Sequence, residues 1–89
     1  MPLSSSRKQE VIKKFQTGEG DTGSPEVQIA LLSTRIENLT GHLKEHGQDV
    51  HSRRGLLSML AKRRRLLNFL KKVDKKRASS LTQKVGLKD

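Results

Sequence analysis

Residues 46–72 read HGQDVHSRRGLLSMLAKRRRLLNFLKK, a long basic and amphipathic segment that starts with a polar turn. We expect a hinge over residues 46–52 and a helix over residues 50–73. Apolar side chains recur there at three- and four-residue spacing and form one broad face. Its members are Leu56, Met59, Leu60, Leu66, Leu67, Leu70 and Val73. Arg63 falls within this face, so its head is expected to reach solvent or a carboxylate such as Glu37.

A second amphipathic segment, residues 24–45, precedes the hinge and is also expected to be a helix. Ser24 and Pro25 are typical of a helix start. The apolar residues follow at alternating spacings of three and four: Ile29, Leu32, Ile36, Leu39 and Leu43. Such a seam packs against a neighbouring helix. We expect Gly47 to end the helix in the left-handed conformation and Asp49 to cap the next one. So short a link makes the two long helices antiparallel neighbours.

Two shorter helices are expected at the ends of the chain. Residues 4–16 carry Ser6 and Gln9 at capping-box spacing, with Phe15 as the anchor that docks this helix. The second is expected over residues 74–85, with Asp74 as its N-terminal cap and Gly86 as the residue that stops it. The sequence therefore predicts an all-α fold in which residues 1–89 form a single domain. Three helices form a small antiparallel bundle, and the N-terminal helix, with few apolar residues, is more loosely attached.

The charge of the chain is concentrated in its second half. The net charge is +10 over 89 residues, and thirteen of the nineteen Lys and Arg residues lie in residues 50–89 with only two acidic residues. Such asymmetry favours a polyanionic partner, either nucleic acid or an anionic membrane. The chain has no cysteine, so disulfides are excluded. No apolar run approaches the ~18 residues of a membrane span, and the first ten residues do not resemble a signal peptide. We therefore expect a cytoplasmic protein.

Catalysis and metal binding find little support in the sequence. His42 and His46 have a helical spacing compatible with zinc, but the chain offers no thiolate and no obvious third ligand. No nucleophile stands beside a base, and a bundle this small is not expected to enclose a pocket. We predict no enzyme activity, no cofactor and no metal site.

Three partners fit the basic surface to different degrees. A membrane helix would need an unpartnered apolar face, whereas here residues 24–45 cover that face. Double-stranded DNA requires a helix free to enter the major groove, and the leucine-flanked run of arginines does not look like a short recognition helix. RNA fits best, because modest polar groups at the hinge can read a shallow minor groove while Lys and Arg neutralise phosphates.

Several features have both a structural and an RNA-binding interpretation. Gln28, Arg35 and His42 lie seven residues apart and form a polar ridge that either faces a partner or is solvated. The loop at residues 17–23, TGEGDTG, is either a flexible connector or a segment whose bare amides approach a ligand. Phe69 lies about 120° from the apolar face. It is either covered by the first or fourth helix or stacks on a base or ribose. Asp49 caps a helix and can also accept a hydrogen bond from RNA.

Three blocks closely resemble the bacterial ribosomal protein S15 family: GDTGSPEVQIALL at 20–32, HSRRGLLSMLAKRRRLLNFLKK at 51–72 and LTQKVGL at 81–87. The resemblance implies a four-helix protein that is monomeric when free. It further implies a primary binder of 16S rRNA at a three-way helical junction, which nucleates the platform of the small subunit. The implied partners also include 23S rRNA at an intersubunit bridge and other small-subunit ribosomal proteins. Some members repress translation of their own mRNA.

The resemblance also implies which residues bind RNA. His42, Asp49 and Ser52 match minor-groove readers, and six residues match a junction-contacting surface: Thr22, Gly23, Gln28, Arg65, Phe69 and Lys72. We add four neighbouring polar and basic residues to the expected set: Arg35, His46, Arg54 and Arg64. The family often has Tyr at the position of Phe69 and Arg at that of Lys72. Those differences remove a hydroxyl contact and a bidentate fork.

Overall fold

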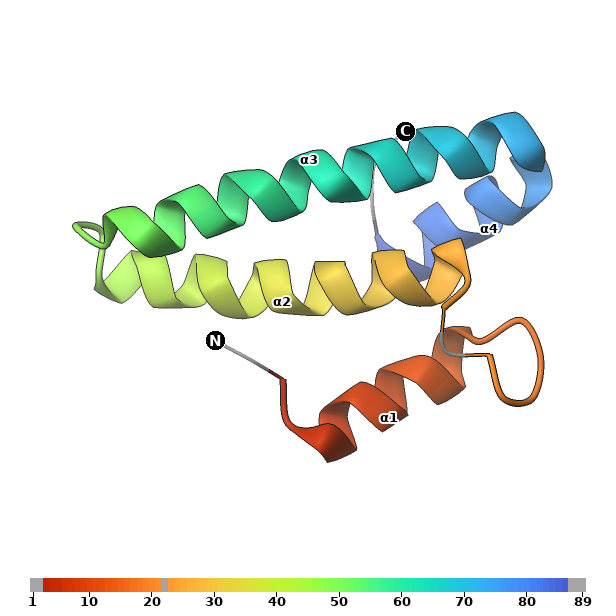
Figure 1. The fold of residues 1–89 in the computed structure, drawn as a ribbon, viewed down its shortest axis with the longest axis horizontal. Helices are drawn as coiled ribbons and strands as arrows, with labels where there is room; N and C mark the ends of the chain where they lie inside the picture. The colour runs from red at the N-terminus through yellow and green to blue at the C-terminus, as the bar shows by residue number, and fades with distance from the viewer. Residues whose placement is uncertain (1–2, 22, 87–89) are drawn as a thin grey trace.

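A computed structural model describes residues 3–21 and 23–86, which form four α-helices and, within those ranges, no strand (Figure 1). The helices are α1 (Ser5–Phe15), α2 (Pro25–Glu45), α3 (Val50–Val73) and α4 (Lys75–Val85). Each begins and ends within one residue of its expected range. The all-α fold class predicted from the sequence is confirmed.

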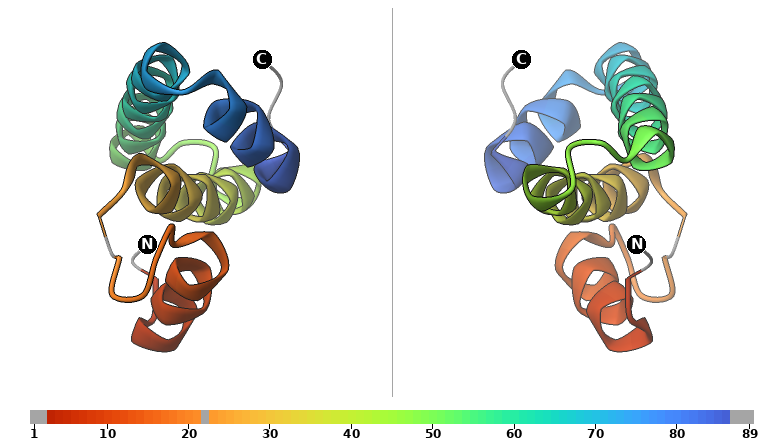
Figure 2. Two further views of the ribbon diagram at one scale, coloured as in Figure 1. Left: turned by 90° about the vertical axis from the view of Figure 1, so that its right-hand side faces the viewer. Right: turned by 90° about the vertical axis from the view of Figure 1, so that its left-hand side faces the viewer.

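Helix α2 is the central element of the molecule. It packs against α1 on one side and against α3 and α4 on the other, as the end-on views show (Figure 2). Within the described residues, the backbone of α1 closely approaches no helix other than α2, whereas the backbone of α3 also approaches α4. The looser attachment expected for the N-terminal helix is therefore confirmed. Val11 of α1 is buried. Leu3, which lies just before α1 and was not singled out from the sequence, is buried as well.

The seam between α2 and α3 follows the predicted heptad spacing. Ile29, Leu32, Ile36 and Leu39 of α2 are all buried. The register is marked by Arg63, whose guanidinium donates a 3.2 Å hydrogen bond to Ser33 Oγ. Burial lowers the pKa of Arg63, and the charge of Glu37, the carboxylate expected as a possible partner, raises it by less.

The densest part of the core lies where α2, α3 and α4 meet. Ile29, Leu67, Leu70, Ala78 and Leu81 form one buried cluster, and the partly buried Phe15 packs against it. Phe15 therefore anchors α1 to the bundle, as expected. The apolar face of α3 stops short of its last turn, because Val73 is 58% exposed. Including Val73 in that face was wrong, since the chain turns into α4 at Asp74 before anything covers it.

The predicted caps are confirmed at three helix starts and wrong at one. Ser24, Asp49 and Asp74 each accept a hydrogen bond from a backbone amide in the first turn of α2, α3 and α4. Helix α1 is capped by Ser4, which accepts from the amide of Arg7, and not by Ser6. In a run of three serines, spacing to a later Gln did not decide which serine caps the helix.

One predicted helix end is also confirmed and the other is wrong. Gly86 ends α4 with φ of 81°, in the left-handed region. Helix α2 instead ends at His46 with φ of −129°, and the only positive-φ glycines in the described ranges are Gly20 and Gly86. Gly47 therefore does not supply a left-handed stop. The stacked histidine and the Asp49 turn bond to His46 close the hinge instead.

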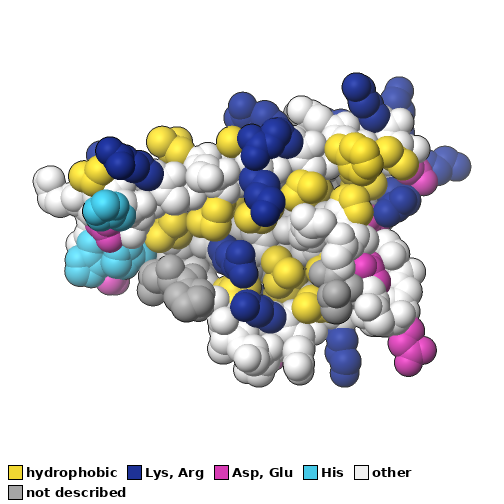
Figure 3. Space-filling view, viewed as in Figure 1, with side chains coloured by type: hydrophobic (Ala, Val, Ile, Leu, Met, Phe, Trp, Pro, Cys, Tyr) yellow, Lys and Arg dark blue, Asp and Glu magenta, His cyan; other side chains and the backbone are white. Residues whose placement is uncertain are grey.

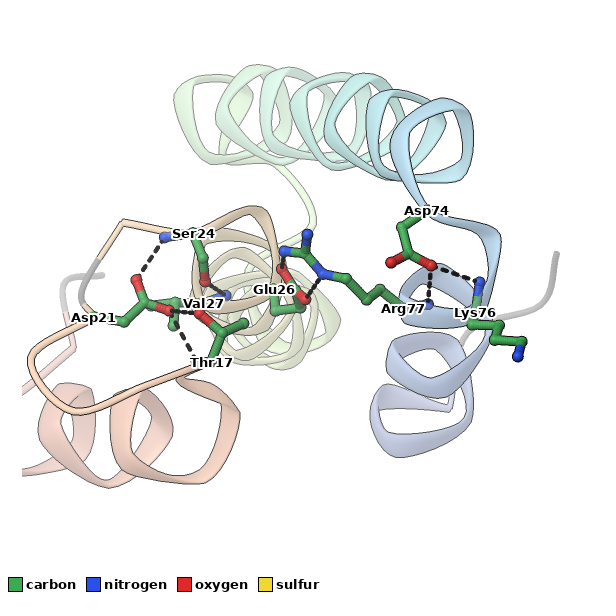
Figure 4. Close-up of polar contacts among 8 residues, drawn as sticks. All are labelled: Thr17, Asp21, Ser24, Glu26, Val27, Asp74, Lys76 and Arg77. Carbon is green, nitrogen blue, oxygen red and sulfur yellow. Dashed lines mark hydrogen bonds and ion pairs between the residues drawn. The ribbon is translucent and has the colours of Figure 1, made fainter.

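A bidentate ion pair joins the start of α2 to the start of α4. Arg77 Nε and Nη2 donate to the two carboxylate oxygens of Glu26, both at 2.7 Å (Figure 4). Glu26 is only 8% exposed, so this contact satisfies a nearly buried charge. The sequence suggested only that Glu26 favours the helix dipole and that Arg77 adds to the basic field. Their 51-residue separation hid the pairing.

This pair makes stability depend on pH in a defined direction. The hydrogen bonds from Arg77 hold the pKa of Glu26 below its ordinary value of 4.5. A carboxyl whose pKa is lowered by folding stabilises the protein above the unfolded pKa and loses that contribution as pH falls through the folded pKa. We predict that Glu26→Gln lowers the free energy of unfolding at pH 7 by about 1–2 kcal/mol, discounted for the partly exposed arginine. The difference from the unmodified chain should shrink below pH 4.5.

Chemical denaturation between pH 3 and pH 7 measures this effect. Glu37→Gln serves as the matched control, because Glu37 is an exposed carboxylate on the same helix. Equal pH profiles for the two variants would show that the ion pair does not stabilise the fold.

Candidate nucleic-acid interface

Three polar side chains meet at the turn between α2 and α3, and we call them the hinge cluster: His42, Asp49 and Ser52. Asp49 Oδ1 accepts from the amide of Ser52 at 3.0 Å, while Oδ2 accepts from the Ser52 hydroxyl at 2.7 Å. His42 Nε2 lies 3.0 Å from the same Oδ2. The structure thus brings together three residues that come from the end of one helix and the start of the next.

The protonation of the hinge cluster follows from these contacts. Hydrogen bonds from the side chain and backbone of Ser52, helped by His42, hold the pKa of Asp49 well below its usual range. The carboxylate is therefore ionised at neutral pH and can only accept. Hence Nε2 of His42 carries the hydrogen, and the Ser52 hydroxyl is committed as a donor. The groups that remain open on the cluster are lone pairs: on Ser52 Oγ, on Asp49 and, in the neutral ring, on His42 Nδ1.

The rest of the hinge supports this cluster. The ring of His46 lies against His42, with centroids 4.8 Å apart and planes tilted by 34°. Arg53 donates from its guanidinium to the carbonyl of Gly47 and so closes the turn. A shallow hollow of about 470 Å³ is lined by His42 and residues 45–49. Arg54, from the expected RNA-binding set, is exposed near the start of α3.

A carboxylate also organises the loop before α2. Asp21 accepts from the amide and hydroxyl of Thr17 and from the amide of Ser24, at 2.9 to 3.0 Å (Figure 4). It also accepts from the amide of Gly23 at 3.1 Å. Hydrogen bonding from Ser24 and Thr17 holds the pKa of Asp21 well below its usual range. Gly20 turns the chain with φ of 83°. The amides of Gly23 and Ser24 are therefore already engaged by the Asp21 carboxylate. Thr22, also expected to bind RNA, lies outside the described residues.

The polar ridge of α2 is partly tied to its surroundings. The amide of Gln28 donates to the carbonyl of Gly23 at 2.7 Å, which leaves the Gln28 oxygen to accept. His42, at the other end, belongs to the hinge cluster. Between them Arg35 is half-buried, and its Nε is buried without a hydrogen-bond partner. The ridge is therefore not a simply solvated flank.

Four of the expected RNA-binding residues follow one exposed side of α3: Arg54, Arg65, Phe69 and Lys72. Phe69 is 55% exposed, so neither α1 nor α4 covers it. The alternative that the first or fourth helix buries this ring is therefore wrong. Arg64 is also exposed but lies about 100° around the helix from Arg65, outside this row. Figure 3 shows Lys and Arg side chains spread over α3 and histidines gathered at the hinge end.

The register of α2 and α3 places the remaining expected residues at the opposite end from the hinge. The Arg63–Ser33 contact and the hinge cluster fix the antiparallel alignment. Continued toward the start of α2, this alignment brings Gln28 level with residues 66–68, about one turn from Phe69. We call this group the junction surface: Gly23, Gln28, Arg65, Phe69 and Lys72.

The described part of the chain holds neither a metal-binding cluster nor a membrane-spanning helix. Residues 3–21 and 23–86 contain no cluster of three or more His, Cys, Asp or Glu side chains arranged to hold a metal ion. Over those same ranges, none of the helices combines the length and apolarity that crossing a bilayer requires.

A small basic helical bundle with acceptors fixed at a hinge and an exposed aromatic among cations has the features of an RNA-binding protein. The comparisons with known proteins agree. The family model for ribosomal protein S15 matches residues 8–88. The small ribosomal subunit protein uS15 of Pseudarthrobacter chlorophenolicus is 52% identical over 88 residues, which is 99% of each chain. The chain therefore belongs to the ribosomal protein S15 family, and it is a cytoplasmic structural protein of the small ribosomal subunit.

The geometry of the hinge separates the two roles of Asp49. Asn is as good a helix cap as Asp, but its single carbonyl oxygen cannot replace an ionised carboxylate that accepts three hydrogen bonds. We predict that Asp49→Asn weakens binding to small-subunit rRNA by roughly ten- to hundredfold, the loss of one specific contact. Its Tm should change by only a few degrees.

Asp74→Asn is the matched control, because Asp74 caps α4 in the same way and lies outside the hinge. Filter binding and thermal melts on both variants test the prediction. Unchanged affinity for Asp49→Asn would mean that Asp49 only caps α3.

Proposed function

We propose that this chain is a primary binder of 16S rRNA, which it grips at a three-way helical junction and at a nearby stretch of one rRNA helix. The observation that carries the proposal is the hinge cluster, with its acceptors fixed by three hydrogen bonds at 2.7 to 3.0 Å. Family membership supports the wider roles that we propose with it. These are nucleation of the small-subunit platform and a contribution to an intersubunit bridge with 23S rRNA.

The hinge cluster suits the minor groove of an RNA duplex. That groove is wide and shallow and displays 2′-hydroxyls, which can donate, and the guanine amino group, which only donates. The open groups of Asp49 and Ser52 are acceptors, so they match those donors. A carboxylate near phosphates is repelled, and it is tolerated only where it accepts a specific hydrogen bond. The cluster therefore supplies sequence and shape discrimination rather than general attraction.

The junction surface suits unpaired or splayed nucleotides. The exposed ring of Phe69 can stack on a base or ribose, and base stacking tolerates many sequences. Arg65 and Lys72 lie four residues before and three after it, on the same side of α3, where they can neutralise the adjoining phosphates. The oxygen of Gln28 completes the surface, while the amide of Gly23 is already bonded to Asp21 and its carbonyl to Gln28.

Helix α3 fixes the distance between the two contacts. Ser52 and Phe69 are seventeen residues apart on one helix, which is about 26 Å along its axis. Once one contact forms, the second is an intramolecular event with a high effective concentration. Two weak contacts on a rigid spacer can therefore select an RNA in which a junction and a minor-groove site lie at that separation.

A salt-titrated binding assay tests the proposed function. We compare the small-subunit junction RNA with a random RNA duplex and a DNA duplex of equal length. We expect tighter binding to the junction RNA at every salt concentration, because specific contacts add to the phosphate attraction shared by all three. Equal affinities and equal salt slopes would instead indicate a general nucleic-acid binder such as a nucleoid protein.

The exposed aromatic gives a separate prediction. Phe69→Ala should weaken binding to the junction RNA by about ten- to hundredfold, the typical loss of one stacked base. It should leave Tm nearly unchanged, since the ring is 55% exposed. The control is Leu57→Ala, which removes a 64% exposed apolar side chain on another side of α3. A fall in Tm without a loss of affinity for Phe69→Ala would place the ring in the fold rather than at the RNA.

A further inference from the structure

A groove between α4 and the end of α1 has no part in the RNA contacts proposed above. It has a volume of about 470 Å³. One wall is formed by Lys76, Ser80 and Lys84 of α4, and the other by residues 15–17 at the end of α1. The Glu26–Arg77 pair closes one side. We call it the α1–α4 groove.

The charged groups left open in this groove are positive. Glu26 is the one carboxylate among its described lining residues, and both of its oxygens accept from Arg77. The hydroxyl of Thr17 donates to Asp21 and is committed as well. In Figure 4, Arg77 reaches across to Glu26, whereas the ammonium of Lys76 extends away from that pair. Lys76 and Lys84 make no ion pair within residues 3–21 and 23–86. The groove is therefore complementary to an anion.

The spacing of these donors indicates a polymeric anion. Lys76, Ser80 and Lys84 follow at four-residue intervals and form one row along α4. The row is about 12 Å long. Successive phosphates of a duplex strand advance by only about 3.4 Å along the axis, so the row spans several of them. A single phosphate group would occupy only one end of it.

The aromatic ring in the groove does not offer a stacking surface. Phe15 packs against the core cluster, and the ammonium of Lys14 lies 5.6 Å from its ring centroid. Its faces are thus already occupied, in contrast to the free ring of Phe69. The groove can hold a sugar–phosphate backbone but has no open platform for a base.

We propose that the α1–α4 groove binds the phosphate backbone of an RNA strand that adjoins the junction, without reading its sequence. Helix α4 starts two residues after α3 ends, so the groove lies at the Phe69 end of the bundle. The proposal rests on the proposed function, because it extends the same RNA contact onto α4. It makes α4 a binding element in addition to a packing element.

A pair of double variants tests this proposal. Lys76→Gln/Lys84→Gln removes the two groove cations that make no ion pair in the described ranges. The control Lys13→Gln/Lys75→Gln removes one exposed cation from α1 and one from α4, both outside the groove. For the groove variant we expect at least a tenfold weaker Kd on the junction RNA and a salt slope smaller by about 1.5, as for two lost phosphate contacts. The control should lose less than about threefold. Equal losses would reflect the general field and would overturn the proposal.

Two further measurements separate the remaining outcomes. Ser80→Glu places a negative charge in the middle of the row on an exposed position, and it should weaken junction binding as strongly as the double groove variant with Tm unchanged. If poly-glutamate competes for the groove as well as the RNA does, the groove is a peptide site and the proposal fails. If the unmodified chain does not prefer junction RNA at all, the proposed function fails first. If the unmodified chain prefers junction RNA but the groove variants bind it normally, the proposed phosphate contact of the α1–α4 groove is wrong and the proposed function stands.

Discussion

The antiparallel seam between α2 and α3 is the constraint on which the other features of the molecule depend. Its buried row of Ile and Leu residues fixes how far the two helices slide past each other, and the Arg63–Ser33 contact marks that register. A shift by one residue would carry His42 out of reach of Asp49 and rotate Phe69 by about 100° relative to α2. The seam therefore sets both the hinge cluster and the junction surface, although it touches neither proposed RNA contact. Close packing transmits position between ends that share no polar contact.

Much of this arrangement could be predicted because it depends on local and periodic signals. The heptad of α2, the apolar face of α3 up to Leu70, and caps such as Ser24 and Asp49 follow from spacing and short-range chemistry. The hinge cluster was also predictable, since a short link between two long helices brings their ends together. Exposure of Phe69 followed from its angle on the helix, but it had to be decided against cover by a neighbour, which depends on tertiary packing.

The errors arose where distant residues or competing local partners decide the outcome. Arg77 and Glu26 are 51 residues apart, and no local pattern around either residue predicts that the two form a pair. Gly47 could have ended α2 in the left-handed conformation, but histidine stacking and the Asp49 turn closed the hinge another way. Among Ser4, Ser5 and Ser6, Ser4 is the one whose hydroxyl oxygen accepts from an amide in the first turn of α1. The glycine-rich loop appeared open in the sequence, yet Asp21 gathers its amides. A signal for that was present, since an Asp three residues before a helix cap is typical of such turns.

The acidic residues explain how a chain of such composition keeps a positive surface and still carries specificity. Five of the carboxylates in the described ranges make hydrogen bonds within the molecule: Glu10 to Arg7, Asp21 to its loop, Glu26 to Arg77, Asp49 to the hinge cluster and Asp74 to the start of α4. A carboxylate satisfied in this way contributes less repulsion toward an approaching phosphate than an open one. Asp49 differs from the others in its place, because it lies at the turn between α2 and α3 beside His42 and Ser52. Under the proposed function, the same chemistry that holds the fold together elsewhere serves as a recognition group at this turn. Attraction to RNA can come from any of the nineteen cations, but the proposed discrimination requires an acceptor held in place, and the hinge cluster offers one.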